Sequence, residues 1–379
     1  MQMTRETIPM RVTASGAQQS IHVFRFTGEP GKNVYIQANI HGPEIAGIGA
    51  AHDLIRILRQ QKTIHGSITV IPSVNPVGLD TKFGTYQVGY ADPNETVVGN
   101  FNRIYQLLVS DKAAGEKVGL EDFVASHLDS DLETITRDFK AALRQAVIAF
   151  QQSREKYGLR HGVKLACTIQ EMAIEADCLI DLHTASVAQY HHFTFKECLA
   201  AARYFGIRHI VQLDETFSGV LDEAFLQPWL RLQQTYAKAG REIDFTDFDK
   251  EAFTLEFGDA DSINRSDMQT DAERIVNYLR AKGVLEGEAT DPEGAFYVCH
   301  TDDYKRYYAP TGGLILWNKQ VGEEVQAGEV IAAILQAYQE TEVPVVAVES
   351  GVINNISKSQ VVHEGMTLCS VLTNIQKLG

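Results

Sequence analysis

The chain has 379 residues, 44% of them hydrophobic and 22% charged, which is ordinary for a globular protein with one large domain, alone or with a smaller companion. Its formal net charge of -15 at pH 7 disfavours nucleic acid as a partner, because phosphate binding needs a surplus of Lys and Arg. Five scattered cysteines, no apolar leader and no run of about 18 apolar residues predict a cytoplasmic chain without a disulfide framework or a membrane partner.

The first half of the chain alternates between strand and helix patterns. Residues 21–27 and 34–40 have the composition of strands, with a glycine-containing turn between them. From Glu44 onward apolar residues recur at helical spacing, and a third strand is expected at 67–72. Residues 104–160 have the pattern of a helical insertion that contains one long amphipathic helix.

The alternation continues to about residue 290. Strands and helices that alternate along a chain predict an α/β domain, here residues 1–290, with a doubly wound and mostly parallel mixed sheet. The remaining elements that we expect in it are strands at 178–182, 209–213 and 252–257 and helices at 165–176, 221–239 and 268–282.

The sequence changes character near residue 290. Residues 287–294 contain Gly, Asp and Pro and are typical of a linker. Short strand patterns separated by glycines follow, with little helical periodicity. We therefore expect a second, small β domain at residues 291–379.

The first residues that could carry chemistry lie in the segment His41-Gly-Pro-Glu44. His41 follows a predicted strand and Glu44 opens the next helix, and this edge of an open α/β sheet is where ligands bind. The tight path that Gly42 permits would let both side chains face one point above the sheet. The alternative is a polar loop in which Glu44 only favours the start of the helix.

A second histidine is expected at the same edge. His183 ends the apolar run that begins at Cys178, and Asp181 precedes it by two residues. Two imidazoles and one carboxylate, with a fourth position open to water, are the usual ligands of a catalytic zinc ion. Asp181 could orient one of these ligands, whereas the alternative for His183 is a hydrogen-bonded core histidine.

Glu256 is the one carboxylate in the apolar strand pattern of residues 253–257. A buried carboxylate is costly unless it is paired or functional, and burial would raise its pKa into the range of a general base. The alternative is an exposed glutamate on an edge strand. The pair Asn102-Arg103 could hold a carboxylate through an amide and a guanidinium fork, or it could be an ordinary surface dipeptide.

Five motifs in this order, HGPE, NPVG, NFNR, DLHT and TLEFG, resemble the succinylglutamate desuccinylase/aspartoacylase family over roughly residues 34–280. The resemblance implies a sheet of the zinc-carboxypeptidase type and a deacylase activity. It assigns roles to six residues: His41, Glu44 and His183 as ligands of one zinc ion per chain, Glu256 as the general base, and Asn102 and Arg103 as binding groups for a substrate carboxylate.

The chain also departs from the family pattern. It has Pro43 where Asp is more usual, and NFNR replaces the commoner DLNR. The family usually has an Arg between the NPxG and Asn-Arg motifs to polarise the scissile carbonyl, whereas Lys82 is the only basic residue in that interval here. Lys82 is therefore our candidate for this role, unless the role falls elsewhere.

The C-terminal region resembles a β-sandwich of the biotinyl/lipoyl type in its segments 309–314, 322–330 and 349–353. A carrier of this type needs a lysine on an exposed hairpin, but residues 320–357 contain none and Lys358 lies beyond the expected hairpin. We therefore expect a structural cap or an oligomerisation module, which makes a homo-oligomer compatible with the sequence.

The sequence as a whole predicts zinc-dependent hydrolysis of the amide bond of an N-acyl amino acid, or of a similar small amide, to a carboxylate and a free amine. One alternative is a zinc carboxypeptidase that acts on peptides, and another is a non-catalytic binding protein that retains zinc. The NFNR motif and the extra β domain favour the deacylase, and Glu256 argues against a pure binding protein. The acyl group and the amine are not determined by the sequence.

Overall fold

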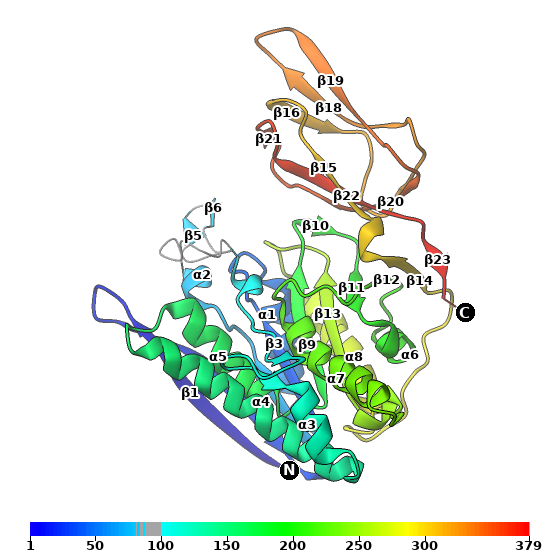
Figure 1. The fold of residues 1–379 in the computed structure, drawn as a ribbon. Helices are drawn as coiled ribbons and strands as arrows, with labels where there is room; N and C mark the ends of the chain where they lie inside the picture. The colour runs from blue at the N-terminus through cyan, green and yellow to red at the C-terminus, as the bar shows by residue number, and fades with distance from the viewer. Residues whose placement is uncertain (81, 84–85, 88–99, 379) are drawn as a thin grey trace.

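The computed structural model describes residues 1–80, 82–83, 86–87 and 100–378. Its main element is a ten-stranded sheet in the order β1-β2-β4-β3-β9-β13-β11-β12-β14-β23 (Figure 1). The strands of this sheet are β1 (Gln2–Val12), β2 (Gln18–Thr27), β3 (Glu29–Ala38), β4 (His65–Ile71), β9 (Cys178–Thr184), β11 (His191–Thr194), β12 (His209–Gln212), β13 (Glu251–Phe257), β14 (Tyr297–His300) and β23 (Gln376–Lys377).

The centre of the sheet is parallel. The strands β4, β3, β9 and β13 pair in parallel, as do β11, β12 and β14. Antiparallel pairs join β1 to β2, β2 to β4, β13 to β11 and β14 to β23. The expected α/β fold with a mixed sheet is confirmed, and the carboxyl ends of β3, β9 and β13 meet at one edge.

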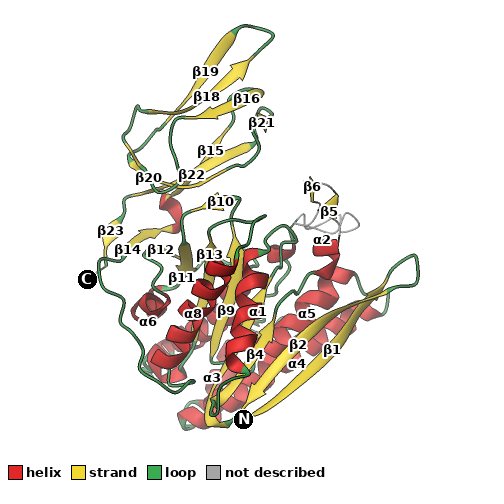
Figure 2. Ribbon diagram, turned by 180° about the vertical axis from the view of Figure 1, so that it is seen from behind, coloured by secondary structure: helices red, strands yellow, loops and turns green. Residues whose placement is uncertain are grey.

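Helices cover both faces of the large sheet. Figures 1 and 2 show α1 and α8 on one face and α3, α4, α5 and α7 on the other. The α-helices are α1 (Ala46–Leu58), α2 (Pro76–Asp80), α3 (Leu120–His127), α4 (Leu132–Glu155), α5 (His161–Ala173), α6 (Leu199–Ala202), α7 (Leu221–Lys238) and α8 (Arg265–Ala281). Short elements connect them: β5 (Lys82–Phe83), β6 (Tyr86–Gln87), η1 (Phe101–Arg103), β7 (Val109–Ser110), β8 (Val118–Gly119), β10 (Val187–Ala188), η2 (Lys196–Cys198), η3 (Arg203–Phe205), η4 (Phe245–Phe248) and η5 (Thr301–Asp303).

The predicted long helix within the insertion is α4. Asp131 caps it by accepting a hydrogen bond from the backbone of Thr134 at 2.7 Å, and an apolar stripe that includes Phe139 and Leu143 is buried. Among the described helices, none combines the length and the apolar character needed to cross a bilayer.

The C-terminal unit consists of two smaller sheets around their own apolar core (Figure 1). One sheet has the order β10-β20-β22-β15, with β17 paired to β20, and the other has the order β19-β18-β16-β21. The strands of this unit are β15 (Tyr304–Tyr308), β16 (Gly313–Trp317), β17 (Glu324–Val325), β18 (Val330–Gln336), β19 (Thr341–Val346), β20 (Gly351–Ile356), β21 (Val361–Val362) and β22 (Thr367–Thr373).

The large sheet and the C-terminal unit are joined by shared strands. β14 and β23 extend the large sheet, although both follow residue 290, and β10 extends one of the C-terminal sheets. The unit therefore leaves the large sheet after β14 and returns to it at β23. It lies over the edge where β9 and β13 end (Figure 1).

Candidate metal and catalytic site

The loop between β3 and α1 places His41 and Glu44. The expected strand at 34–40 ends at Ala38, because Asn39 has a positive φ of 65° and its side chain donates to the carbonyl oxygen of His41 at 2.9 Å. Gly42 passes so close to Gly78 that an added Cβ would lie 2.4 Å from a backbone carbon. Glycine at this position therefore allows the tight loop that the motif suggested.

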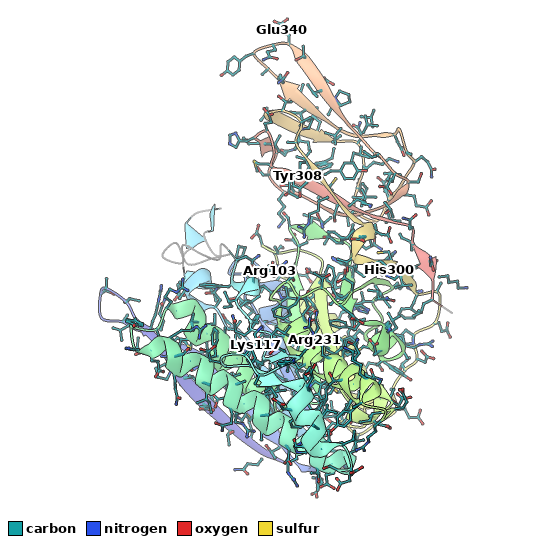
Figure 3. The ribbon with its side chains drawn as sticks, viewed as in Figure 1. Arg103, Lys117, Arg231, His300, Tyr308 and Glu340 are labelled. Carbon is teal, nitrogen blue, oxygen red and sulfur yellow. The ribbon has the colours of Figure 1, made fainter. Side chains whose placement is uncertain are left out.

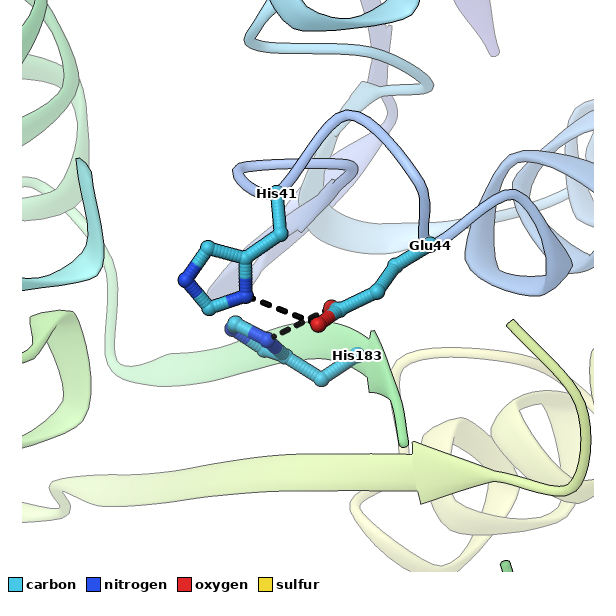
Figure 4. A group of neighbouring side chains, drawn as sticks. All are labelled: His41, Glu44 and His183. Carbon is cyan, nitrogen blue, oxygen red and sulfur yellow. Dashed lines mark hydrogen bonds and ion pairs between the residues drawn. The ribbon is translucent and has the colours of Figure 1, made fainter. Parts of the chain in front are cut away.

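His41, Glu44 and His183 meet at the edge of the sheet (Figure 4). Nδ1 of His41 lies 2.8 Å from one carboxylate oxygen of Glu44, and Nδ1 of His183 lies 3.0 Å from the other. One donor atom from each residue lies within 4.8 Å of the other two, and all three residues are buried. This donor set is suited to a zinc ion.

The electrostatics of the three residues favour a cation between them. Burial alone would raise the pKa of Glu44, but the imidazoles of His41 and His183 outweigh it and lower this pKa to about 2. Burial would lower the pKa of His183, but the carboxylates of Asp181 and Glu44 raise it well above its ordinary value. A bound metal cation would compensate the negative charges of the buried Glu44 and Asp181 carboxylates in place of protons.

The strand register places Gln37 and Asp181 next to each other, beside His183. Gln37 on β3 pairs with Asp181 on β9, and its side-chain amide donates to one Asp181 oxygen at 3.1 Å. The other Asp181 oxygen lies at ion-pair distance, 3.1 Å, from Nε2 of His183, and Nδ1 of the same ring faces Glu44. Gln37 was not predicted as part of the site, because it is recognisable only from the pairing of β3 with β9.

Glu256 lies on β13 directly opposite His183 on β9. Because β13 runs between β9 and β11, the alternative of a glutamate on an edge strand is wrong. Burial raises the pKa of Glu256 to about 7, with a further rise from the charge of Glu44 and an opposing effect of His183. Glu256 lines the same cavity as the three candidate ligands.

Asn102 and Arg103 lie on η1, beside the candidate ligands. The Asn102 amide nitrogen is 3.4 Å from Nε2 of His183, and Asn102 is buried. Arg103 donates from Nη1 to the carbonyl oxygen of Asn102 at 2.6 Å, and Figure 3 shows it at the edge of the large sheet that faces the C-terminal unit. Lys82 lies in β5, and its side chain is outside the described part of the structure.

The three candidate ligands, Glu256 and the pair Asn102-Arg103 line one cavity of about 340 Å³. Other residues that the sequence did not predict line it as well. Tyr304 and Arg306 reach it from β15, so the C-terminal unit contributes to the site. No local signal singled them out, because only the fold brings β15 to this edge. The lining residues are His41, Glu44, Asn100, Asn102, Arg103, His183, Thr184, Ala185, Phe193, Leu213, Ser218, Val220, Asp222, Glu223, Thr254, Glu256, Thr301, Tyr304 and Arg306.

The two arginines of the cavity influence each other. Burial lowers the pKa of Arg103, the carboxylate of Glu223 raises it, and the charge of Arg306 lowers it further. Arg306 lies with its Cζ 5.7 Å from the centre of the Tyr304 ring, whose hydroxyl accepts a hydrogen bond from the Asn355 amide at 2.7 Å. Within the described residues, no carboxylate forms an ion pair with Arg306.

The chain matches the model of the succinylglutamate desuccinylase/aspartoacylase catalytic domain over residues 30–282. No curated protein matches it. A protein of Shewanella amazonensis SB2B, assigned to the same family, has a solved structure with 29% sequence identity and a TM-score of 0.90 over 99% of this chain and 100% of that one. A similarly assigned protein of Shewanella frigidimarina NCIMB 400 has 28% identity and a TM-score of 0.89 over 99% and 98% of the two chains.

More distant structures share the fold. The product-bound ectoine utilization protein EutE (DoeB) of Ruegeria pomeroyi is 16% identical, with a TM-score of 0.65 over 97% of this chain and 94% of that one. The match to the family model extends from β3 to the end of α8 and so covers well over half of the residues. The chain therefore belongs to the succinylglutamate desuccinylase/aspartoacylase family.

Proposed function

We propose that the chain is a zinc-dependent amidohydrolase that converts an N-acyl amino acid, or a similar small amide, to a carboxylate and a free amine. The observation that carries this proposal is the convergence of His41, Glu44 and His183 beside Glu256 in one cavity. Membership of a deacylase family supports the same reaction class. A volume of about 340 Å³ is of the size that suits a small molecule.

His41, Glu44 and His183 would hold one zinc ion. When bound, zinc would supply Lewis-acid chemistry, polarising the amide carbonyl and lowering the pKa of a water molecule toward about 7. The chain's own contribution is to place the donor atoms: Glu44 lies between the two imidazoles, and a carboxylate oxygen of Asp181 lies 3.1 Å from the far nitrogen of the His183 ring.

Glu256 would act as the general base and then as the general acid. Burial raises the pKa of its carboxyl group to about 7, so the group can take a proton from water and return it to the leaving nitrogen near neutral pH. The position of Glu256, opposite His183 across paired strands, supports this role.

Arg103 and Asn102 would bind the substrate carboxylate. A guanidinium fork and an amide together can fix both the position and the orientation of a carboxylate, which aligns the amide bond for attack. The cation that polarises the scissile carbonyl is Lys82 in our sequence-based proposal. Arg306 is a second candidate, because it lines the cavity and has no ion-pair partner among the described residues.

We further propose that residues 1–290 form a catalytic domain of the zinc-carboxypeptidase type, to which β14 and β23 add two strands, and that the rest of residues 291–379 is a sandwich of the biotinyl/lipoyl type that serves as a cap. The contacts of Lys358 support a cap rather than a carrier. Its ammonium group pairs with Asp259 and lies 3.8 Å from Asp261, which both belong to the catalytic part. A lysine held in this way is not a free swinging arm.

The test is hydrolysis of a panel of N-acetyl and N-succinyl amino acids by the purified chain, with zinc and with excess chelator. We expect release of a free amine from at least one compound and its loss in chelator. Full activity in chelator would contradict zinc dependence. Cleavage of peptides alone would favour a carboxypeptidase, and binding of the compounds without cleavage would favour the binding protein.

A further inference from the structure

The two histidines of the candidate metal site are held by unlike partners. Nε2 of His183 lies 3.1 Å from a carboxylate oxygen of Asp181, whereas Nε2 of His41 lies 2.7 Å from the side-chain oxygen of Asn100. In both rings Nδ1 is left facing Glu44. Among the contacts of the described residues, Nε2 of His183 therefore has a carboxylate at ion-pair distance and the Asn102 amide at 3.4 Å, whereas Nε2 of His41 has the neutral amide oxygen of Asn100.

The side-chain oxygen of Asn100 has a second partner. It accepts the backbone N–H of Asn102 at 2.7 Å and so caps η1. The carbonyl oxygen of Asn100 also accepts the backbone N–H of Arg103 at 3.1 Å. The backbone N–H of Asn102 can only donate, which identifies the Asn100 atom as the amide oxygen and makes Nε2 of His41 the donor in the second contact.

Asn100 thus joins two parts of the site that come from different segments. His41 follows β3, and η1 carries the two residues that we assign to the substrate carboxylate. If the side chain of Asn100 is removed, the His41 ring loses a hydrogen-bond partner at Nε2, and the first turn of η1 loses its cap. Both halves of the site would then become less well ordered.

We propose that Asn100 is a positioning residue that couples the metal ligand His41 to the substrate-binding turn, and that its neutral amide sets the zinc affinity below what a carboxylate would give. The inference rests on the proposed function, because it assigns Asn100 a role toward the metal and toward the substrate. A carboxylate makes a stronger hydrogen bond to an imidazole N–H and raises the basicity of the ring, so an aspartate here would bind zinc more tightly.

The experiment compares Asn100→Asp, Asn100→Ala and the reciprocal variant Asp181→Asn with the unmodified chain. Zinc affinity is measured without substrate, by competition with a chromophoric chelator. We expect Asn100→Asp to tighten zinc binding about tenfold, and Asn100→Ala and Asp181→Asn to weaken it about 10- to 100-fold. Circular dichroism of the metal-free proteins checks that each variant is folded.

The second measurement is steady-state kinetics at saturating zinc on the N-acyl amino acid that the panel identifies. Asn100→Ala should raise KM more than it lowers kcat, because η1 is uncapped, and Asn100→Asp should restore KM to within about threefold, because a carboxylate oxygen still accepts the N–H of Asn102. Asp181→Asn keeps the cap of η1 and should therefore raise KM less than Asn100→Ala does.

The outcomes distinguish this inference from the proposed function. Zinc affinities within twofold of the unmodified chain in both Asn100 variants would overturn the inference even if the enzyme is active. The expected affinity shifts in a chain that hydrolyses no amide would support the role toward the metal and contradict the proposed function. Should Asn100→Ala fail to fold, Asn100→Asp alone still decides, because an unchanged or weakened affinity overturns the inference.

Discussion

The cavity has two unlike walls. The wall from the large sheet includes the buried ligand candidates His41, Glu44 and His183, with the partly buried Glu256 opposite His183 on the neighbouring β13. The wall from the C-terminal unit presents Arg306, which is exposed, and Tyr304, which is only partly buried. In our proposal the large sheet holds the metal and the general base, and the C-terminal unit contributes a cation, Arg306, whose target on the substrate can be tested.

The largest effect should come from removing a metal ligand in the wall of the large sheet. In His183→Ala, zinc content should fall from about one ion per chain to a small fraction of that, because the remaining His41 and Glu44 supply only two ligands. Elemental analysis after dialysis measures this, and hydrolysis should fall below detection. A variant that keeps one zinc ion per chain would remove His183 from the ligand set.

The next largest effect should come from Glu256→Gln. Glutamine keeps the shape and hydrogen bonding of Glu256 but cannot accept a proton, so kcat should fall by roughly 10²- to 10⁴-fold while zinc content stays near that of the unmodified chain. Steady-state kinetics and elemental analysis on one preparation check both points. Turnover equal to that of the unmodified enzyme would exclude Glu256 as the base.

The sequence predicted the wall of the large sheet better than the other wall. His41, Glu44, His183 and Glu256 each stand on or next to a strong strand pattern, so their shared edge follows from the α/β alternation. β1 was not predicted, because most of its residues are exposed and give no apolar alternation.

Residues whose place depends on tertiary structure were missed. Asn100 precedes the predicted pair Asn102-Arg103, but nothing in the sequence shows that its amide reaches His41. Arg306 lies 48 residues beyond Gly258, where the last motif ends, and only the position of β15 over the sheet edge brings it to the cavity. Long-range contacts of this kind have no signal in local periodicity.

The junction between the two walls should make stability depend on pH. His191 and His192 on β11 are fully buried, and burial lowers their pKa values to about 4 and about 3. His191 contacts the Asn354 amide at 3.3 Å, whereas the ring nitrogens of His192 have no partner among the described residues. In the unfolded chain both rings would titrate near the ordinary value of about 6.5.

The direction in which stability changes with pH follows from proton binding by the folded and the unfolded chain. Between about pH 6.5 and pH 4 the unfolded histidine binds a proton and the folded one does not, so the free energy of unfolding falls as the pH falls, by about 2 kcal/mol for each histidine at pH 5. When the pH falls from 7 to 5, the free energy of unfolding of His192→Phe should decrease by about 2 kcal/mol less than that of the unmodified chain. Urea unfolding at both pH values measures this difference.

The control for this prediction is His363→Phe, which replaces an exposed histidine in the C-terminal unit. It should keep the pH dependence of the unmodified chain. An equal loss of stability in His192→Phe and the unmodified chain would show that His192 is accessible to protons in the folded state.

The smallest effect should come from the wall of the C-terminal unit. Because Arg306 is exposed and has no ion-pair partner among the described residues, Arg306→Gln should leave zinc content and the free energy of unfolding nearly unchanged. If its charge acts on the remote part of the substrate, KM should rise by about tenfold or less and kcat should change little, since the interaction would be similar in the ground and transition states. A large loss of kcat would instead identify Arg306 as the cation that polarises the scissile carbonyl.

Lys305→Gln is the matched control, because Lys305 is next to Arg306 on β15 and lies 3.7 Å from Glu349 rather than lining the cavity. If both variants raise KM equally, the effect comes from the net charge of the unit, and the wall has no specific role in binding.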